Sequence, residues 1–336
     1  MDSYEKNILT SGTQLDPKNL YARRLENLKG THPDGVIICG MGGSGLAGDI
    51  IHSASEELRL KVPVVTWKNY GLPKHQFRHP LYLFISFSGN TEETLSGLTE
   101  LLRRHHGKWP PAHIAIITTG GKLLKLTESK KLATVSFPAG VLTPRQSIAT
   151  MFYAVSETLH AAGLMPKARR FPHIDPKSHR AAGKKLAAKL KNRLIVIYTG
   201  ERHRYLGYIW KIKFNETSKV QAFNDVLPEM DHNELTAFDA PSKGARFKTA
   251  ALFLHRKDLT GHIAKKFRIT KHLLKTRNVS VIELPFTGRT ELEKVWRTII
   301  LADWTSYFLG KLNGIPLEEF NIVNPKIVID LKRLMG

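Results

Sequence analysis

The alternation of short apolar runs with helical segments is the feature of this sequence that most restricts its fold. Runs such as GVIICG (35–40), LYLFIS (81–86) and AHIAIITT (112–119) are continuously apolar or nearly so, and each precedes a longer segment with helical character. Strands that are apolar on both faces and are separated by helices predict a parallel sheet covered on both sides. We therefore expect a three-layer α/β fold.

The alternation occurs twice, which predicts two domains of similar design. Between the two series lies MPKARRFPHIDPK (165–177), whose prolines and basic residues indicate a connector. We expect an N-terminal helical arm at residues 1–24, a first domain at 25–164 and a second domain at 178–336. A chain of 336 residues is long enough for two ordinary domains.

The charge of the chain favours anionic partners. Fifty-one Lys and Arg residues against 29 Asp and Glu give a formal net charge of +22, which attracts nucleic acids or phosphorylated small molecules. The basic residues are dispersed along amphipathic segments, and neither zinc-finger spacing nor an RNA-binding aromatic motif accompanies them. We therefore interpret the basic segments as solvated helix faces and do not expect a nucleic-acid partner.

The single cysteine and the hydropathy of the chain indicate a cytoplasmic protein. Cys39 lies inside an apolar run, which predicts a buried structural thiol, and one cysteine excludes an intramolecular disulfide. The sequence has no apolar run long enough for a membrane span, and its first residues lack the apolar segment of a secretory signal. No membrane partner is expected.

The glycine-rich stretch GMGGSGLAGD (40–49) follows the first apolar run and opens a helical segment. Glycines let a ligand approach the main chain, and the N–H groups at a helix N-terminus bind anions. The spacing fits the dinucleotide-binding fingerprint only loosely, and no Gly-Lys-Ser/Thr of a Walker A loop follows. Taken alone, the stretch is also compatible with a tight structural turn.

A second stretch, SFSGNTEETL (86–95), also follows an apolar run and opens a helical segment. Asn90 and Glu93 have the spacing of an N-cap with its capping-box partner. Three hydroxyl side chains gather beside Gly89, and capping does not explain them: Ser86, Ser88 and Thr91. Together the two stretches predict a phosphate site made of hydroxyl groups and helix-end N–H groups, without a lysine.

These two stretches resemble the motifs of sugar isomerase (SIS) domains. With TPRQSI (143–148), KFNETSK (213–219) and PEMDHNEL (228–235), the chain resembles the bifunctional phosphoglucose/phosphomannose isomerase family over essentially its whole length. The resemblance implies two flavodoxin-like SIS domains, a homodimer, no metal and no cofactor. It also implies interconversion of glucose 6-phosphate or mannose 6-phosphate with fructose 6-phosphate. The matching residues imply phosphate binding by Ser44, Ser86, Ser88 and Thr91, with Gly43 lining the sugar.

Aldose–ketose isomerisation needs a base that reaches C1 and C2, a group that opens the ring and a cation beside the developing oxyanion. The resemblance assigns the base to Glu216, which we expect to be partly desolvated. It assigns ring opening to His232, contributed across the dimer interface, and stabilisation of the enediolate to Arg145. Lys311 is a further catalytic candidate, from a looser local match.

Each of these residues also has an ordinary structural interpretation. Glu216 between Lys213 and Lys219 fits a solvated carboxylate on a helix surface, and His232 fits a turn or cap residue. Arg145 at a predicted helix start fits a surface residue, and a lysine near a helix C-terminus, such as Lys311, is favourable there without any ligand.

Two other functions are compatible with the sequence. The high positive charge is compatible with a non-catalytic SIS-domain sensor that binds a sugar phosphate, although no helix-turn-helix appendix is present. The hydroxyl-rich stretches are also compatible with an isomerase of an amino-sugar phosphate. The sequence leaves the preference between glucose and mannose open, and it provides no cluster of metal ligands at usual spacing.

Overall fold

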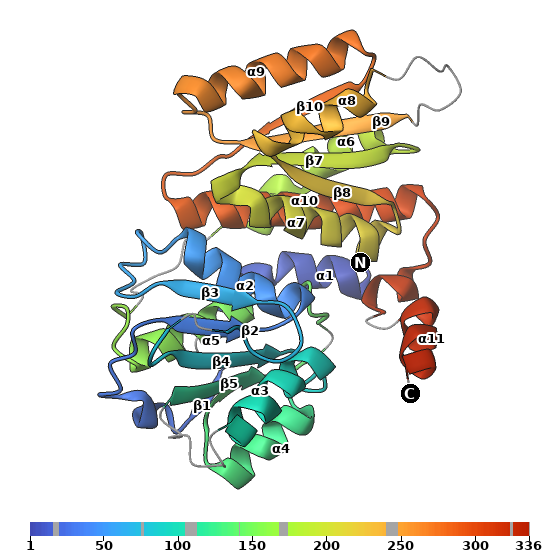
Figure 1. Cartoon of the computed structure of the whole chain (residues 1–336). Helices are drawn as coiled ribbons and strands as arrows, with labels where there is room; N and C mark the ends of the chain where they lie inside the picture. The colour runs from blue at the N-terminus through green and yellow to red at the C-terminus, as the bar shows by residue number, and fades with distance from the viewer. Residues whose placement is uncertain are drawn as a thin grey trace. The chain divides into compact units, whose positions relative to one another are not determined.

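The chain folds into two α/β units. The computed structural model describes residues 1–15, 20–74, 77–104, 113–140, 142–167, 174–239, 248–322 and 325–335. The N-terminal unit comprises Thr10–His173, and the C-terminal unit comprises Met1–Leu9 together with Ile174–Gly336 (Figure 1). The predicted α/β class with parallel sheets is confirmed.

The N-terminal unit is built on a six-stranded sheet of order β1-β6-β5-β4-β2-β3. All neighbouring strands are parallel except the edge strand β1, which is antiparallel to β6. The strands are β1 (Tyr21–Arg23), β2 (Val36–Cys39), β3 (Val64–Trp67), β4 (Leu81–Ser86), β5 (Ile114–Thr118) and β6 (Ala133–Ser136). Because β2, β4 and β5 are buried on both faces, their sequences are continuously apolar.

Helices cover both faces of this sheet. On one face α3 (Glu92–Arg104) and α4 (Gly121–Lys130) pack against a core that includes Ile37, Phe84 and Ile116. Two other helices, α2 (Gly42–Ser53) and α5 (Ile148–Ala161), pack against each other and against β3 and β5 respectively. The parallel strands β2, β4 and β5 therefore end in turns that lead directly into α2, α3 and α4.

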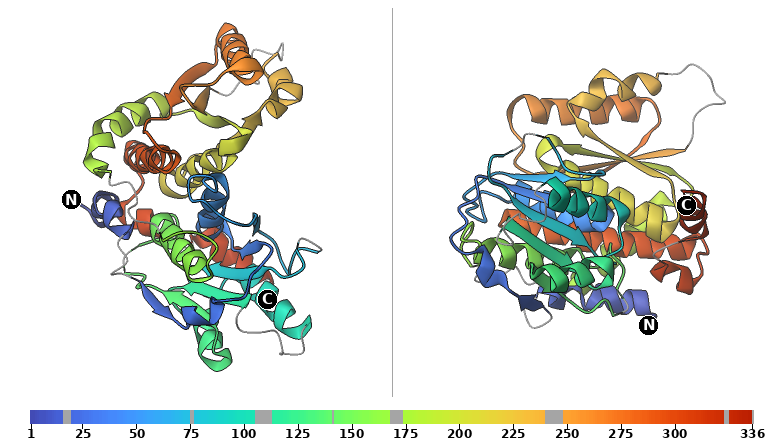
Figure 2. Two further views of the ribbon diagram at one scale, coloured as in Figure 1. Left: turned by 90° about the vertical axis from the view of Figure 1, so that its left-hand side faces the viewer. Right: turned by 60° about the horizontal axis from the view of Figure 1, so that its bottom comes forward.

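The C-terminal unit is built on a four-stranded parallel sheet of order β10-β9-β7-β8. Its strands are β7 (Leu194–Gly200), β8 (Ala222–Leu227), β9 (Thr249–His255) and β10 (Ser280–Pro285). Its α-helices are α1 (Ser3–Leu9), α6 (Arg180–Leu190), α7 (Arg204–Lys213), α8 (Glu234–Ala237), α9 (Gly261–Thr276), α10 (Glu291–Leu312) and α11 (Lys326–Met335). The left view of Figure 2 shows α9 and α6 on opposite sides of the sheet.

The strands that the sequence did not predict are β1, β3 and β8. The edge strand β1 is exposed along its length, and β8 contains Asn224 and Asp225, so neither has an uninterrupted apolar pattern. The predicted arm at residues 1–24 is divided between the units, because α1 belongs to the C-terminal unit and β1 pairs with β6. Of the predicted connector at 165–177, residues 168–173 lie outside the described part of the chain.

Candidate active site

The turn between β2 and α2 places Ser44 against the following strand turn. The helix α2 begins at Gly42, so Gly42, Gly43 and Gly45 of this motif lie at its start and only Gly40 precedes it. Gly42 has a φ of +47°, which L side chains rarely adopt. The Ser44 side chain is buried, and its Oγ accepts a hydrogen bond from the Phe87 N–H at 3.2 Å. A hydrogen bond therefore joins the two predicted motifs directly.

The second turn, between β4 and α3, gathers its hydroxyl groups. The Ser86 Oγ and Thr91 Oγ1 atoms are 2.7 Å apart, and the Gly89 N–H donates to Ser86 Oγ at 3.1 Å. Ser86 is fully buried and Thr91 is half-buried, whereas Ser88 is exposed and its Oγ accepts from the Asn90 N–H at 3.2 Å. The structure thus brings Ser44, Ser86 and Thr91 together at the carboxyl ends of β2 and β4, where α/β sheets bind ligands.

Asn90 caps a different helix from the one that the sequence predicted, so that prediction is wrong. Its Oδ1 accepts a hydrogen bond from the Lys122 N–H at 3.0 Å, so Asn90 caps the first turn of α4. The helix that the sequence assigned to it, α3, begins at Glu92 with Thr91 immediately before it. Asn90 therefore ties the second turn to the next strand–helix turn along the sheet.

Glycines hold these turns in close contact. A Cβ on Gly89, whose φ is +67°, would lie 1.8 Å from the Gly120 carbonyl oxygen. A Cβ on Gly121 would lie 2.3 Å from the Ser88 carbonyl oxygen. Both distances are far below any contact that a real Cβ makes, so the turns after β4 and β5 can pack together only with glycine at both positions.

Arg145 lies in a turn that packs against the first motif. The helix α5 begins at Ile148, so Arg145 precedes the helix instead of occupying its first turn, as the sequence had suggested. A Cβ on Gly43 would lie 2.8 Å from the Pro144 carbonyl oxygen and 3.3 Å from the Arg145 nitrogen. Arg145 is 1% exposed, which excludes its interpretation as a surface residue. Gly43, Ser44 and Arg145 are thus neighbours in the N-terminal unit.

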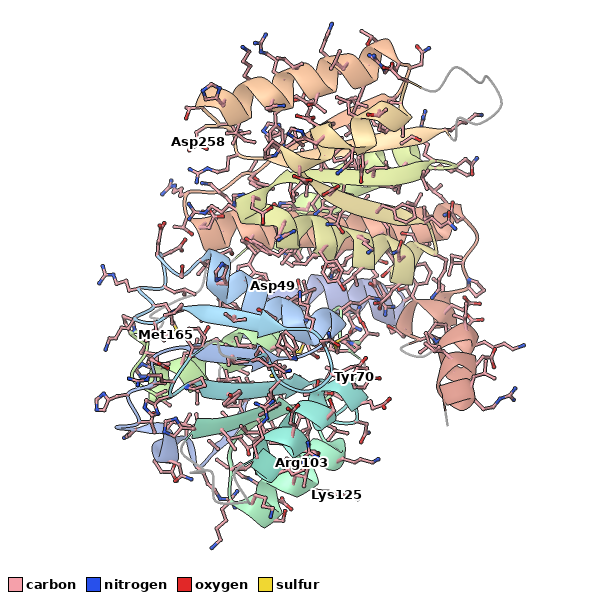
Figure 3. The ribbon with its side chains drawn as sticks, in the orientation of Figure 1. Asp49, Tyr70, Arg103, Lys125, Met165 and Asp258 are labelled. Carbon is pink, nitrogen blue, oxygen red and sulfur yellow. The ribbon has the colours of Figure 1, made fainter. Side chains whose placement is uncertain are left out.

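Sequence reasoning missed Lys68, which lies beside the first motif. It directly follows β3, and its Cε would be 3.0 Å from a Cβ on Gly45. Its ammonium forms an ion pair with Asp49 of α2, which is labelled in Figure 3. Its position at the carboxyl end of a strand was the available signal, but β3 had not been predicted. Lys68 is therefore a cation beside the first motif, and its ammonium is paired with Asp49.

Glu216 lies on a π-helical segment, Phe214–Ser218, that continues α7. Segments of π-helix are rare and frequently occur at functional sites. The Glu216 side chain is exposed, so the described residues of this chain do not provide the desolvation expected for the base. The neighbouring Lys213, which the solvated interpretation placed at the surface, is buried and forms an ion pair with Asp303 of α10.

His232 ends the 3-10 helix Glu229–His232, and its side chain is exposed. Two residues later, Glu234 opens α8 and accepts a hydrogen bond from the Tyr198 hydroxyl at 3.0 Å. Burial and the neighbouring Asp225 carboxylate raise the pKa of Glu234, although the hydrogen bond from Tyr198 opposes this effect. The half-buried Glu234 therefore contributes to the structure that follows His232.

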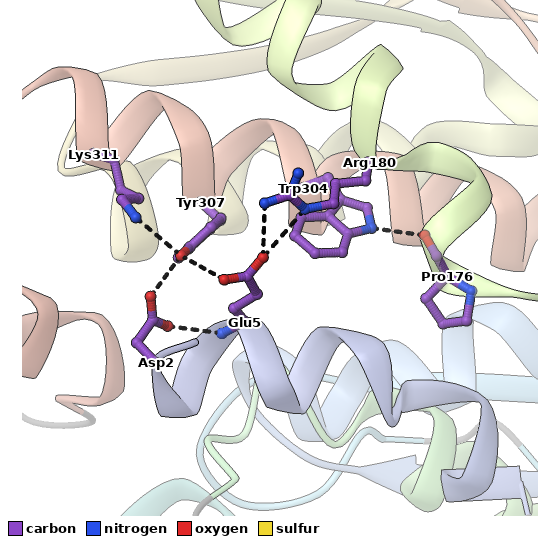
Figure 4. Close-up of polar contacts among 7 residues, drawn as sticks. All are labelled: Asp2, Glu5, Pro176, Arg180, Trp304, Tyr307 and Lys311. Carbon is purple, nitrogen blue, oxygen red and sulfur yellow. Dashed lines mark hydrogen bonds and ion pairs between the residues drawn. The ribbon is translucent and has the colours of Figure 1, made fainter.

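Lys311 lies near the end of α10 and is exposed. Its Nζ donates to the Tyr307 hydroxyl at 3.3 Å, and the Tyr307 hydroxyl donates to Asp2 Oδ2 at 2.5 Å (Figure 4). Lys311 thus belongs to a group of polar side chains that connects α10 with α1. These contacts fit its structural interpretation at a helix end.

Three further predictions concern individual features of the chain. Cys39 is a free, buried thiol, as predicted, and burial raises its pKa well above the ordinary value. Within the described residues, no group of three or more His, Cys, Asp or Glu side chains is placed to hold a metal ion. Nor does the described part of the chain contain a helix long and apolar enough to cross a bilayer.

Comparisons with known proteins agree with the motifs. Residues 180–325 match the family described as bacterial phospho-glucose isomerase C-terminal SIS domain. The chain is 32% identical to a bifunctional phosphoglucose/phosphomannose isomerase of Aquifex aeolicus, over 83% of this chain and 85% of that protein. It is 24% identical to a D-glucosamine-6-phosphate 4-epimerase of Sulfolobus acidocaldarius, over 87% of each.

The fold also has relatives among solved structures. A hypothetical protein from Thermus thermophilus has a TM-score of 0.67 to this chain at 16% identity, covering 98% of this chain and 91% of that protein. At that identity the likeness concerns the fold alone. The motifs occur in order along the chain, and the turns after β2 and β4 are joined by a hydrogen bond. Because a relative is also more than 30% identical over most of both chains, the chain belongs to the bifunctional phosphoglucose/phosphomannose isomerase family.

Proposed function

We propose that this protein interconverts glucose 6-phosphate, mannose 6-phosphate or both with fructose 6-phosphate. The observation that best supports the proposal is the hydrogen bond between the two hydroxyl-containing motifs, in which Ser44 lies at the start of α2 and Ser86 and Thr91 precede α3. The names of the relatives support the same reaction class. The two units correspond in this proposal to the two predicted SIS domains.

In this proposal the phosphate group binds at the turns after β2 and β4. Hydroxyl groups of Ser44, Ser86, Ser88 and Thr91, together with helix-end N–H groups, donate to its oxygens. Gly43 lines the sugar, because a position without a side chain admits the ligand to the main chain. Such a site holds a phosphate dianion by many neutral donors, so product release does not require breaking a buried ion pair.

Glu216 is the proposed base. Its carboxylate removes the C2 proton of the open-chain aldose, and the electron pair forms the C1–C2 double bond of a cis-enediol as the carbonyl oxygen gains a proton. Returning this proton to C1, while the C2 hydroxyl loses its own proton to form the C2 carbonyl, gives the ketose. The Arg145 guanidinium stabilises the developing oxyanion, a task for which its planar array of donors is suited and which requires no metal in this scheme.

His232 is proposed to assist ring opening, since an imidazole donates or accepts a proton near neutral pH. We further propose a homodimer in which His232 serves the site of the partner subunit, for which its exposure in the chain is suitable. Lys311 is a further proposed catalytic residue, and in this structure its ammonium donates to the Tyr307 hydroxyl. The buried free thiol of Cys39 is compatible with a cytoplasmic location.

A hybrid dimer tests the shared site. We expect Glu216→Gln and His232→Ala homodimers to be nearly inactive. A hybrid with one subunit of each kind, purified through two different tags, should recover about half of the wild-type activity, because one of its two sites then contains both native residues. Refolded homodimers of each variant are the controls. A pure hybrid as inactive as its parents would contradict a His232 contribution across the interface.

The reaction itself is tested by assaying fructose 6-phosphate formation from glucose 6-phosphate and mannose 6-phosphate, together with the consumption of glucosamine 6-phosphate. We expect turnover of glucose 6-phosphate, mannose 6-phosphate or both without added metal. The similarity to an epimerase of an amino-sugar phosphate makes glucosamine 6-phosphate the second candidate substrate. Exclusive turnover of that compound would replace the proposal, and tight binding of all three without turnover would favour the sensor.

A further inference from the structure

The π-helical segment that carries Glu216 is held by a residue from the far N-terminus of the chain. The Tyr4 hydroxyl lies 2.9 Å from the Thr217 Oγ1 atom, and both side chains are buried. Thr217 follows Glu216 directly, so this hydrogen bond acts on the peptide next to the proposed base. The bond joins residues 213 positions apart in the sequence.

The same segment is fixed on α10 as well. The Ser218 Oγ donates to the Ser306 carbonyl oxygen at 2.8 Å, and a Cβ on Gly310 would lie 3.1 Å from the Thr217 carbonyl oxygen. At the start of the segment, the buried Lys213 ammonium pairs with Asp303 of α10. Buried contacts with α10 therefore hold both ends of the π-helical segment.

The helix α1 that supplies Tyr4 is itself docked on α10. The Tyr4 ring is stacked on the Tyr307 ring, with centroids 6.0 Å apart and an interplanar angle of 7°, and it also contacts Phe320. Around them the Tyr307 hydroxyl donates to Asp2, and the Arg180 guanidinium donates to Glu5 at 3.0 Å (Figure 4). These contacts fix α1 on α10 and thereby fix the position of the Tyr4 hydroxyl beside Thr217.

We propose that Tyr4 is a positioning residue for the isomerase reaction, acting through Thr217 on the placement of Glu216. The inference rests on the proposed role of Glu216 as the base. A π-helical turn is less favourable than the α-helix it interrupts, so it persists only where tertiary contacts hold it. A base that serves two adjacent carbons depends closely on its placement, and a displacement of about 1 Å can cost about 100-fold in rate. The N-terminal helix is thereby part of the catalytic apparatus.

Two conservative variants test this role. Tyr4→Phe and Thr217→Val each remove one hydroxyl and keep the shape of the side chain, and each should lower kcat about tenfold while KM changes less than about twofold. Thr217→Ser, which keeps a hydroxyl, should restore kcat to within about threefold of wild type. The matched control is Thr158→Val, which removes a buried hydroxyl bonded to the Ala154 carbonyl oxygen in the N-terminal unit and should leave kcat unchanged.

The double variant separates positioning from stability. If the two hydroxyls act as one contact, Tyr4→Phe with Thr217→Val should lower kcat no further than the more damaging single change. A merely structural contact would lower the melting temperature in both variants and leave kcat within about twofold, and that result would overturn the inference. Additive losses in kcat would overturn it as well.

Failure of the inference and failure of the proposed function give different results. Without isomerisation of any sugar phosphate by the wild-type protein, the proposed function fails. With an active wild type and an unimpaired Glu216→Gln variant, the assignment of the base fails. With an active wild type, an impaired Glu216→Gln variant and a normal Tyr4→Phe variant, only the positioning role of Tyr4 fails.

Discussion

Replacing Glu216 with glutamine is expected to lower kcat by about 10²- to 10⁴-fold, the usual contribution of a general base. The amide keeps the size of the carboxylate but cannot accept the C2 proton. The KM for the sugar phosphate should change by less than about threefold, since the proposed phosphate donors lie on other turns. Steady-state kinetics with glucose 6-phosphate and mannose 6-phosphate measure both constants.

A matched control for this experiment is Glu201→Gln. Glu201 is an exposed carboxylate in the same unit, paired with Arg204 at the surface, and its replacement should leave kcat unchanged. Exchange of the C2 proton with solvent deuterium adds a direct readout, because it reports proton removal even where turnover is slow. Normal exchange and normal kcat in the Glu216→Gln variant would remove Glu216 from the mechanism.

Replacing Gly89 with alanine should lower the free energy of unfolding by about 3 kcal/mol or more. The left-handed φ of +67° alone costs an L residue about 1–2 kcal/mol. The new Cβ would in addition lie 1.8 Å from the Gly120 carbonyl oxygen, so the turns after β4 and β5 must separate. Separation displaces Ser86 and Ser88, and affinity for fructose 6-phosphate should fall with the stability. Urea unfolding and calorimetric titration measure the two effects.

Gly163→Ala is the comparison that isolates the contact from the backbone conformation. Gly163 has a φ of +72° in the same unit, but a Cβ there would meet nothing within 4 Å. Its replacement should cost only the conformational strain of about 1–2 kcal/mol and leave ligand affinity unchanged. Equal losses of stability in the two variants would show that the contact between the turns contributes little.

The sequence was sufficient for the parts of the fold that depend on local patterns. Buried parallel strands such as β4, which lies in the predicted run LYLFIS, are buried throughout and therefore have a continuous apolar pattern. It failed for β8, where Asn224 and Asp225 interrupt the apolar pattern of the strand. Pairing with the preceding strand β7 makes this segment a strand, and no pattern within the segment itself records that pairing.

For the site, the motifs identified the turns but not the contacts that shape them. Asn90 has the spacing of a cap for its own helix, yet it caps α4, which only the adjacency of β4 and β5 makes possible. Arg145 and Lys213 have the sequence context of surface residues, and both are buried. Burial of a charged side chain depends on partners from other elements, such as Asp303 for Lys213, and no local pattern records them.

The donors at the joined turns have a consequence for the behaviour of the site in acid. Hydroxyl groups such as those of Ser86 and Thr91 neither gain nor lose a proton between pH 5 and pH 9. A phosphate monoester, in contrast, gains its second proton near about pH 6. When these groups alone hold the ester, the loss of affinity on acidification comes from protonation of the ligand. A sulfate ester keeps its single charge, so its affinity for the site should stay constant between pH 5 and pH 9.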